Sequence, residues 1–297
     1  MDKPSPWHTA HRVVMWGIRL LPLPLGRLGY RAYHKLLRTH RWSYLGRSYF
    51  GATFNCDLHD LIQRMIFYFG VWEPDISRVI DDTLRPGDVF ADVGSNVGYD
   101  ALLAARRVGA NGRVVAIEAS SRTFALLERN LALNGADNVR AVKAAVADRA
   151  GTLELYEQDA GNIGAATTLA SRGGTRLETV DALPLTSILT PDEIARLRLL
   201  KMDVEGAEPA ILRAIIADLS RFPRDMEIIV EASPQDDASW EQVFAEMKAN
   251  GFAAYEIANS YEIDWYLGWR RPTPLRKIDT MTRGQQDLLF SRRQRAT

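Results

Sequence analysis

Residues 89–98 read VFADVGSNVG, an apolar run that passes directly into a glycine turn. The apolar run predicts a strand, and residues 101–107 beyond the turn predict a helix. Gly94 and Gly98 permit the left-handed backbone that such a turn needs, and Asn96 is the residue type that tolerates it next best. Glycines between a strand and a helix let a ligand approach the amides of the helix N-terminus. This stretch therefore predicts the ligand-binding turn of an α/β fold.

The chain on either side of this turn alternates between apolar strands and amphipathic helices. Further strands are expected at 113–118, 139–145, 152–156, 197–203 and 227–231, with helices at 123–134, 209–219 and 239–250. Such alternation is typical of a doubly wound, mostly parallel sheet with helices on both faces. Residues 252–258 and 288–291 are expected to add a closing pair of strands. Residues 157–196 carry little pattern and are expected to form a long loop.

Two helices are expected before the alternating region. Helical spacing predicts the first from near Asp57, on the stripe Leu58, Leu61, Ile62, Met65, Ile66 and Phe69. The second is expected to start at Pro74, a residue suited to the first helical position. We divide the chain into a basic, aromatic-rich N-terminal extension (1–55), a helical lead-in (56–87) and a ligand-binding domain (88–297).

The composition is that of an ordinary globular chain. Of the 297 residues, 46% are hydrophobic and 25% are charged, which excludes a disordered chain, a collagen-like fibre and a coiled coil. The single cysteine, Cys56, excludes an intramolecular disulfide and a cysteine-based zinc site, so a cytoplasmic protein is expected. Charges and prolines interrupt the apolar run 13–28, which disfavours both a membrane-spanning helix and a signal peptide.

The net charge of zero conceals an uneven distribution. Residues 1–50 hold nine Lys and Arg against one acid (+8), and residues 265–297 hold eight against two (+6), so residues 51–264 carry −14. Residues 11–21 are compatible with a basic amphipathic helix on an anionic membrane surface, at the inner face of the cell membrane. The alternative is an arm packed on its own core or on a second subunit. The oligomeric state stays open.

Two acidic residues near the glycine turn indicate which class of ligand the turn binds. Glu118 closes the next strand 20 residues beyond Gly98, the spacing at which an acid grips a ribose hydroxyl. Asp92, two residues before Gly94, would oppose a pyrophosphate but suits an ammonium group beside a carboxylate, as in the methionine end of S-adenosylmethionine. An NAD-dependent oxidoreductase is the alternative that Asp92 disfavours.

A second acidic cluster follows a later strand. Residues 203–208 read DVEGAE, directly after the strand 197–203. Because ligands bind beyond the carboxyl ends of the strands in such sheets, Asp203 and Glu205 are expected to face the same crevice as Gly94, and Glu231 to join them. Asp203 and Glu205 are candidate general bases for a hydroxyl acceptor. Glu208 fits a helix N-terminus, and Mg²⁺ held by the acids is an alternative to a metal-free site.

These motifs together resemble the FkbM family of S-adenosylmethionine-dependent methyltransferases. The resemblance rests on residues 89–98, Glu118, residues 130–135 (NLALNG) and residues 200–208 (LKMDVEGAE), and extends over about 70–231. It implies a seven-stranded, Rossmann-like methyltransferase sheet, here with an N-terminal helical extension. It also implies O-methylation of a hydroxyl on a sugar, a glycolipid or a secondary metabolite.

The resemblance also implies roles for particular residues. Those expected at the cofactor are Asp92, Gly94, Ser95, Asn96, Gly98, Glu118, Ala119 and Asp203. Asp203 and Glu205 are expected near the transferred methyl group. Ser95 stands where the family usually has Ala, and Ala119 where it usually has Pro; both changes are small.

Other functions stay open beside this one. A nucleic-acid methyltransferase would use the basic ends, but no Asn-Pro-Pro-Tyr-like element follows the fourth strand and the middle of the chain is acidic, so no nucleic-acid partner is expected. A scaffold that binds the cofactor without catalysis is a further alternative. His59 is a candidate second base on the helix from 57, and Tyr68 and Trp72 are candidates for an aromatic wall over the substrate.

Overall fold

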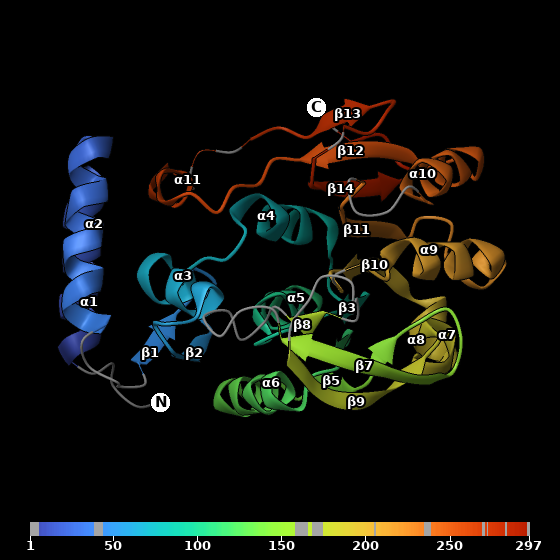
Figure 1. Ribbon diagram of the computed structural model, residues 1–297, viewed down its shortest axis with the longest axis horizontal. Coiled ribbons are helices and arrows are strands. Elements are labelled where there is room, and N and C mark those ends of the chain that lie inside the picture. The colour runs from blue at the N-terminus through green and yellow to red at the C-terminus, as the bar shows by residue number, and fades with distance from the viewer. Residues whose placement is uncertain are drawn as a thin grey trace.

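A mixed sheet of eight strands forms the centre of the computed structural model (Figure 1), which describes residues 6–38, 44–157, 166–167, 175–204, 206–234, 239–268, 271, 273–282 and 284–295. From edge to edge the strands are β13 (Arg276–Ile278), β12 (Ala253–Ile257), β14 (Gln286–Ser291), β11 (Glu227–Ala232), β10 (Leu197–Met202), β3 (Val89–Val93), β4 (Arg113–Glu118) and β5 (Val139–Lys143). The pairings from β11 to β5 are parallel, and those of β14, β12 and β13 are antiparallel. Seven of the eight expected strands lie in this sheet, and the eighth, at 152–156, lies in a separate sheet described below. β13 is an additional edge strand, so the sheet has eight strands where the resemblance implied seven.

Helices cover both faces of this sheet and bury it. One face packs against α4 (Pro74–Thr83), α5 (Tyr99–Val108) and α6 (Ser121–Asn134). The other packs against α7 (Leu185–Ile188), α8 (Pro191–Ala195), α9 (Glu208–Ala217) and α10 (Ser239–Ala249). Every residue of β3 and β10 is buried, which explains their near-continuous apolar sequences. The doubly wound Rossmann-like fold expected from the sequence is therefore confirmed.

The strand order reverses between β3 and β10. From β3 the chain moves outward through β4 to β5, and it returns to the other side of β3 at β10 before it continues to β11. Ligands bind in doubly wound sheets outside the carboxyl ends of the strands at such a reversal. The fold thus places the glycine turn after β3 and the acidic residues after β10 side by side.

The expected loop 157–196 is wrong over its second half. Residues 175–195 form β9 (Thr175–Leu183), α7 and α8, and β9 joins β6 (Ala145–Val146), β7 (Gly151–Glu157) and β8 (Ala166–Thr167) in a second, four-stranded sheet. The apolar signal was weak because within β9 only Val180 and Ala182 are buried, and because α7 and α8 are too short to show a helical period. Residues 158–165 and 168–174 lie outside the described part of the chain.

The helix expected from Asp57 begins later, as α3 (Leu61–Phe69). Asp60 ends the preceding turn: its carboxylate accepts a hydrogen bond from the Gln63 amide at 2.9 Å, as an N-cap does. Leu58 is buried although it lies before the helix, which is why it extended the apolar stripe. The expected start at Pro74 is confirmed for α4.

The N-terminal extension is helical, as expected. Its helices α1 (Pro6–Leu20) and α2 (Leu23–Arg38) pack together. The strands β1 (Tyr44–Arg47) and β2 (Thr53–Cys56) pair antiparallel and pack against α3. In Figure 1 the two helices stand at one side of the molecule, away from the central sheet. Among the described residues, no helix combines the length and the apolar character needed to cross a bilayer.

Candidate active site

A cavity of about 330 Å³ lies at the carboxyl ends of β3, β4, β10 and β11. Its floor and rim come from the turns after these strands, from α3, from the second sheet and from the segment before α11 (Ile263–Gly268). The lining residues used below are Leu61, Ile62, Trp72, Glu73, Gly94, Asn96, Glu118, Ala119, Asp203, Glu231 and Tyr261. Its volume is within the range of pockets that bind small molecules.

Gly94 is required where β3 meets the turn. Its φ is +83°, and a Cβ atom at this position would lie 1.9 Å from the backbone oxygen of Asp203. The Asp203 amide also donates a hydrogen bond to the Val93 carbonyl, at 3.0 Å. Any side chain at 94 would separate the two strands' ends, so glycine here is what brings Asp203 against the turn.

Asn96 adopts the left-handed conformation expected of it, with φ of +50°. Glu118 at the end of β4 holds this turn: its Oε2 accepts from the Asn96 amide and its Oε1 from the Ser120 amide, each at 2.9 Å. Burial raises the pKa of Glu118 to about 7, against the lowering effect of these amides. Glu118 and Ala119 line the cavity, so a ligand beside the turn would meet both.

Asp92 lies beneath the cavity floor rather than in its lining. Its side chain is 1% exposed, and neither carboxylate oxygen has a hydrogen-bond partner among the described residues. Burial raises its pKa to about 7, while the nearby Lys201 ammonium lowers it. Buried acceptors are nearly always satisfied, so Asp92 fits a site in which a ligand or an ordered water donates hydrogen bonds.

Two other expected cofactor residues support the turn from behind. The Ser95 hydroxyl donates to the Asp92 carbonyl at 2.8 Å, and Ser95 is 4% exposed. Gly98 precedes α5 with φ of +83°, and a Cβ there would lie 2.6 Å from Leu127 Cδ1. Neither residue lines the cavity, so any contact they make with a ligand runs through the backbone they shape.

Lys201 ties the acidic residues of this region together. It is 5% exposed, and its Nζ lies 3.2 Å from Asp100 Oδ2 and 3.6 Å from Asp203 Oδ2. Lys201 therefore pairs with two carboxylates, one on α5 and one at the end of β10. Asp203 keeps about a third of its side chain exposed, into the cavity that it lines.

Of the two other acidic residues in the 203–208 motif, Glu208 holds the loop and Glu205 lies outside the described residues. Glu208 is buried, and its carboxylate accepts from the Val204 amide at 3.0 Å and from the Gly206 amide at 2.9 Å. It therefore holds the loop between β10 and α9 closed, in addition to its place in the first turn of α9.

Glu73 is a cavity residue that the sequence did not reveal. It precedes Pro74 in a left-handed conformation, with φ of +42°, and is 2% exposed. Its Oε1 accepts from the Tyr261 hydroxyl at 3.0 Å, and its Oε2 has no partner among the described residues. Burial raises its pKa to about 8. A strained, buried carboxylate in a cavity is typical of a functional position.

Trp72 and Tyr68, the two residues expected to form an aromatic wall over the substrate, lie in different places. Trp72 lines the cavity and stacks on Tyr261, with ring centres 5.3 Å apart and a 9° interplanar angle. Tyr68 instead is buried against the N-terminal helices, where its hydroxyl lies 3.2 Å from the His34 ring. The aromatic wall therefore holds for Trp72 and is wrong for Tyr68.

His59 is not on a helix. It lies in the turn before α3, half exposed, and its ring bonds to Asp57 at 3.0 Å. It is absent from the cavity lining, so its role as a second base is wrong. Among the described residues, no group of three or more His, Cys, Asp or Glu side chains is placed to hold a metal ion.

Comparison with protein families identifies the family of this chain. A family model described as the methyltransferase FkbM domain matches residues 92–254. The 31-O-demethyl-FK506 methyltransferase FkbM of Streptomyces tacrolimicus is 29% identical over 197 residues, covering 57% of this chain and 74% of that protein. Methyltransferase sdnD of Sordaria araneosa is 29% identical over 160 residues, covering 44% of this chain and 61% of that protein, less than two thirds of its length.

A solved structure of the same description is also similar. The methyltransferase FkbM of Methylobacillus flagellatus KT superposes with a TM-score of 0.43 and 13% identity, covering 77% of this chain and 53% of that one.

Proposed function

The chain belongs to the FkbM family of methyltransferases, and we propose that it transfers a methyl group from S-adenosylmethionine to a hydroxyl group of a sugar, a glycolipid or a secondary metabolite. The observation that carries this proposal is the convergence of Glu118, the Gly94 turn and Asp203 on one cavity. The printed name of the Streptomyces relative, which specifies a 31-O position, supports a hydroxyl oxygen as the acceptor.

The residues present fit S-adenosylmethionine. Glu118 would accept hydrogen bonds from the ribose hydroxyls, because a carboxylate has about four acceptor positions and two are taken by amides. Asp92 offers two buried oxygens without a partner near the turn, a fit for the ammonium group of the methionine end. Asn96 and Ala119 would line the same ligand. When bound, the cofactor supplies an electrophilic methyl group.

We assign Asp203 to the acceptor. A hydroxyl becomes a strong nucleophile only as its proton leaves, so a carboxylate within hydrogen-bond reach assists by accepting that proton. Asp203 fits because its side chain reaches the cavity while Lys201 holds it from below. Glu205, the second candidate base, remains a proposal from the sequence. Glu73 and Tyr261, which also line the cavity, offer further polar contacts to a hydroxylated substrate.

The acidic lining also bears on which partners we propose. Glu73, Glu118, Asp203 and Glu231 all face the cavity, whereas nucleic-acid phosphates bind Lys and Arg. We therefore propose a neutral hydroxylated substrate and no nucleic-acid partner. We propose a cytoplasmic protein with peripheral contact to the inner membrane surface through its N-terminal helices.

Calorimetric titration with S-adenosylhomocysteine tests the cofactor site. We expect micromolar binding to the wild type and about 10- to 100-fold weaker binding to Glu118→Ala, since a hydrogen bond to a charged group contributes about 1.5–3 kcal/mol. Glu128→Ala, the same change on the exposed face of α6, is the matched control and should bind as the wild type does. NAD is titrated in parallel.

The outcomes separate the functions. Binding of NAD in place of S-adenosylhomocysteine would favour an NAD-dependent oxidoreductase over a methyltransferase. Equal affinity of Glu118→Ala and wild type would remove Glu118 from the site. Thermal unfolding of all three proteins shows whether a loss of binding reflects only a disturbed turn.

A further inference from the structure

The two N-terminal helices form a hairpin that presents two faces. The inner face of this hairpin (residues 6–38) docks on α3: Tyr30 packs against Tyr68 and Phe69, and the His11 ring nitrogen Nε2 lies 2.9 Å from the Phe67 carbonyl oxygen. Met15 and Ile18 are buried in the same contact. The inner face therefore accounts for one apolar stripe of each helix.

The outer face of the hairpin carries a second apolar stripe. On α1, Val13, Trp16 and Leu20 recur at helical spacing and are 62%, 64% and 65% exposed. On α2, Leu25 and Leu28 are 53% and 63% exposed. Single exposed apolar side chains are ordinary, but a stripe shared by two adjacent helices marks an interaction surface.

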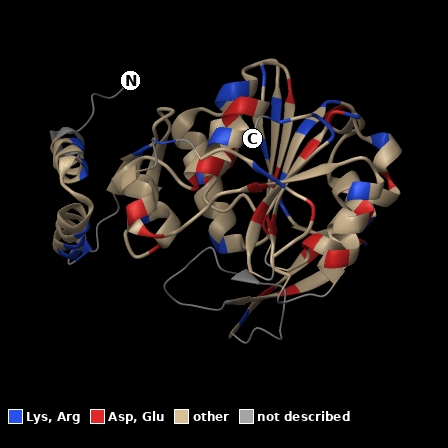
Figure 2. Ribbon diagram, turned by 90° about the horizontal axis from the view of Figure 1, so that it is seen from above, with Lys and Arg blue, Asp and Glu red and all other residues tan. Residues whose placement is uncertain are grey.

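The charge of the hairpin has one sign. Residues 6–38 contain six Lys and Arg and no Asp or Glu. Figure 2 shows the same result, with blue segments and no red ones on these helices. Arg12, Arg31 and Lys35 are exposed on the same two helices as the apolar stripe. Arg27 is compensated by an ion pair with Asp264 of α11. The exposed apolar side chains and the remaining cations match a surface that is both apolar and negatively charged.

We propose that the outer face of the N-terminal hairpin binds the surface of an anionic lipid bilayer. Helices of this kind lie in the interface plane, with apolar side chains among the acyl chains and cations at the headgroups. A second copy of the chain is a poorer occupant, because two hairpins meeting face to face would bring their like charges together. The lipid surface satisfies both the apolar stripe and the charge.

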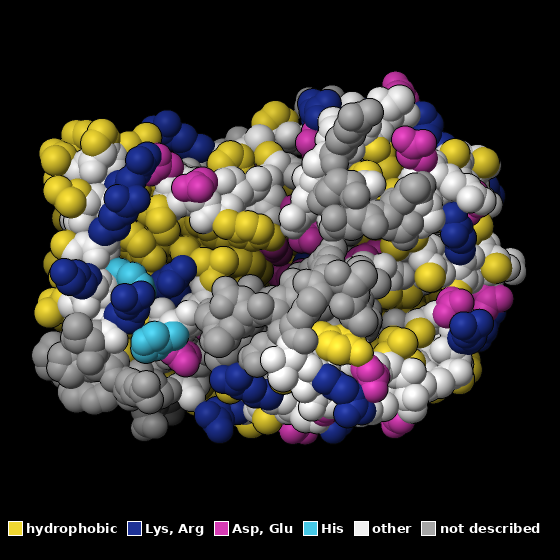
Figure 3. Space-filling view, in the orientation of Figure 1, with side chains coloured by type: hydrophobic (Ala, Val, Ile, Leu, Met, Phe, Trp, Pro, Cys, Tyr) yellow, Lys and Arg dark blue, Asp and Glu magenta, His cyan; other side chains and the backbone are white. Residues whose placement is uncertain are grey.

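The hairpin lies near the cavity, so membrane binding through its outer face bears on which substrates reach the site. It rests on the C-terminal half of α3, whereas Leu61 and Ile62 at the start of α3 line the cavity. A nine-residue helix is about 13 Å long and a helix with its side chains is about 10–12 Å wide, so the cavity edge would lie on the order of 25 Å from the bilayer surface. Figure 3 shows apolar side chains between the hairpin and a hollow in which acidic atoms are visible. Resting on the function proposed above, the acceptor would then be a hydroxyl of a lipid-linked glycan that extends over this distance from the bilayer.

Vesicle co-sedimentation of the full chain tests the surface. Wild type is mixed with phosphatidylcholine vesicles, with or without about one third phosphatidylglycerol, at low and at high salt. We expect pelleting with the anionic vesicles, weakened by salt. Each cation near such a surface contributes enough that removing two, in Arg31→Gln with Lys35→Gln, should lower the partition coefficient about 30-fold. Trp16→Gln with Leu28→Gln should abolish pelleting.

The controls make each outcome decisive. Leu133→Gln with Leu177→Gln changes two exposed apolar residues elsewhere, 46% and 44% exposed, and should pellet as the wild type does. Equal pelleting of the Trp16 and Leu28 variant and the wild type would overturn the proposal. So would light scattering that shows a wild-type dimer lost in that variant. Binding of S-adenosylhomocysteine is measured on every variant, so that a failed cofactor site is distinguished from a failed membrane surface.

Discussion

Asp203→Asn is expected to lower turnover at least 100-fold while leaving the affinity for S-adenosylhomocysteine within a few-fold of the wild type. A positioned base contributes about 10²–10⁴-fold to rate, and an amide cannot accept the acceptor's proton. The substitution keeps the shape of the side chain. It also leaves Lys201 paired with Asp100 at 3.2 Å, so the buried ammonium is not orphaned. The rate is therefore expected to fall without loss of the fold.

The measurement is single-turnover methyl transfer to an accepted hydroxyl compound, with calorimetric cofactor affinity beside it. Asp181→Asn, the same change at an exposed position on β9, should retain wild-type turnover. Glu73→Gln is the informative comparison, since Glu73 is a buried carboxylate of the cavity lining whose Oε2 lacks a hydrogen-bond partner among the described residues. If Glu73→Gln loses turnover and Asp203→Asn does not, the proton-accepting role belongs to Glu73.

The sequence predicted the cofactor turn because its determinants are local. Glycine and asparagine are the residue types that best tolerate a left-handed backbone, so their positions predict where it occurs. Gly94 and Asn96 both adopt the expected positive φ. The strand ends are local as well, since an apolar run stops where burial stops. Once the topology is known, Glu118 and Asp203 follow at the same edge of the sheet.

Glu73 could not be predicted in this way because its environment is assembled from distant segments. Its hydrogen-bond partner Tyr261 lies 188 residues away in the chain. Neither residue belongs to a period or a spacing, and the signal within the chain is only a charged residue between Trp72 and Pro74. The second apolar stripe of the hairpin was not predicted, because Pro22 before α2 and Pro24 in its first turn appeared to interrupt the helical pattern.

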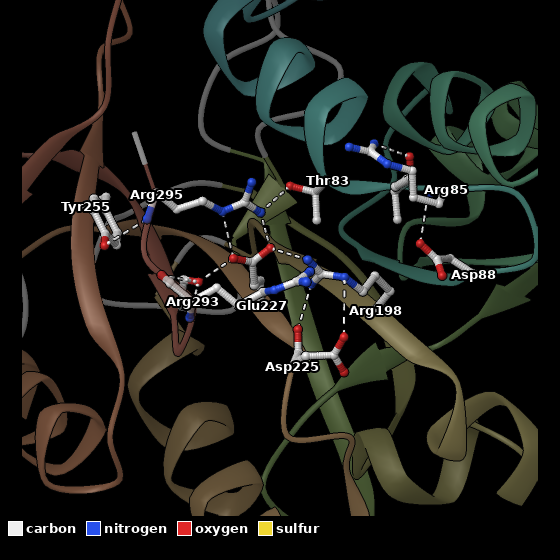
Figure 4. Close-up of polar contacts among 11 residues, drawn as sticks. Thr83, Arg85, Asp88, Arg198, Asp225, Glu227, Tyr255, Arg293 and Arg295 are labelled. Carbon is white, nitrogen blue, oxygen red and sulfur yellow. Dashed lines mark hydrogen bonds and ion pairs between the residues drawn. The ribbon is translucent and has the colours of Figure 1, made fainter. Parts of the chain in front are cut away.

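A second carboxylate network lies at the opposite end of β11 from the cavity (Figure 4). Glu227 is fully buried and receives hydrogen bonds from Arg198 at 2.9 Å and from Arg295 Nε at 2.8 Å. Ser291 also donates to it, and Arg295 reaches on to the Thr83 hydroxyl at 2.6 Å. One carboxylate thus joins β10, β11, β14, α4 and the C-terminal residues. Figure 4 shows the two guanidinium groups on either side of it.

Glu227→Ala is expected to lower the free energy of unfolding by about 3–5 kcal/mol, the usual effect of removing one partner from a buried ion pair. The loss is large because the partly buried guanidinium of Arg295 would lose this carboxylate, and Arg198 would keep the more distant carboxylate of Asp225, at 3.9 Å. Urea unfolding followed by circular dichroism measures it. Glu241→Ala, the same change at an exposed position on α10, should stay within about 0.5 kcal/mol of the wild type.

The pH dependence of this effect has a definite sign. Burial raises the pKa of Glu227, but the hydrogen bonds from Arg295 and Ser291 and the charges of both arginines outweigh it, so the folded-state pKa lies below the ordinary value. A depressed carboxylate stabilises the fold above its unfolded pKa of about 4.3, and this contribution is lost as pH falls through the folded-state pKa. The stability difference between wild type and Glu227→Ala should therefore be constant near neutral pH and shrink in acid. A difference that grows below pH 4 would contradict the ionised state of Glu227.

Because the network lies away from the cavity, S-adenosylhomocysteine should bind the folded Glu227→Ala variant as tightly as the wild type. Equal binding would show that Glu227 stabilises the fold without contributing to the cofactor site.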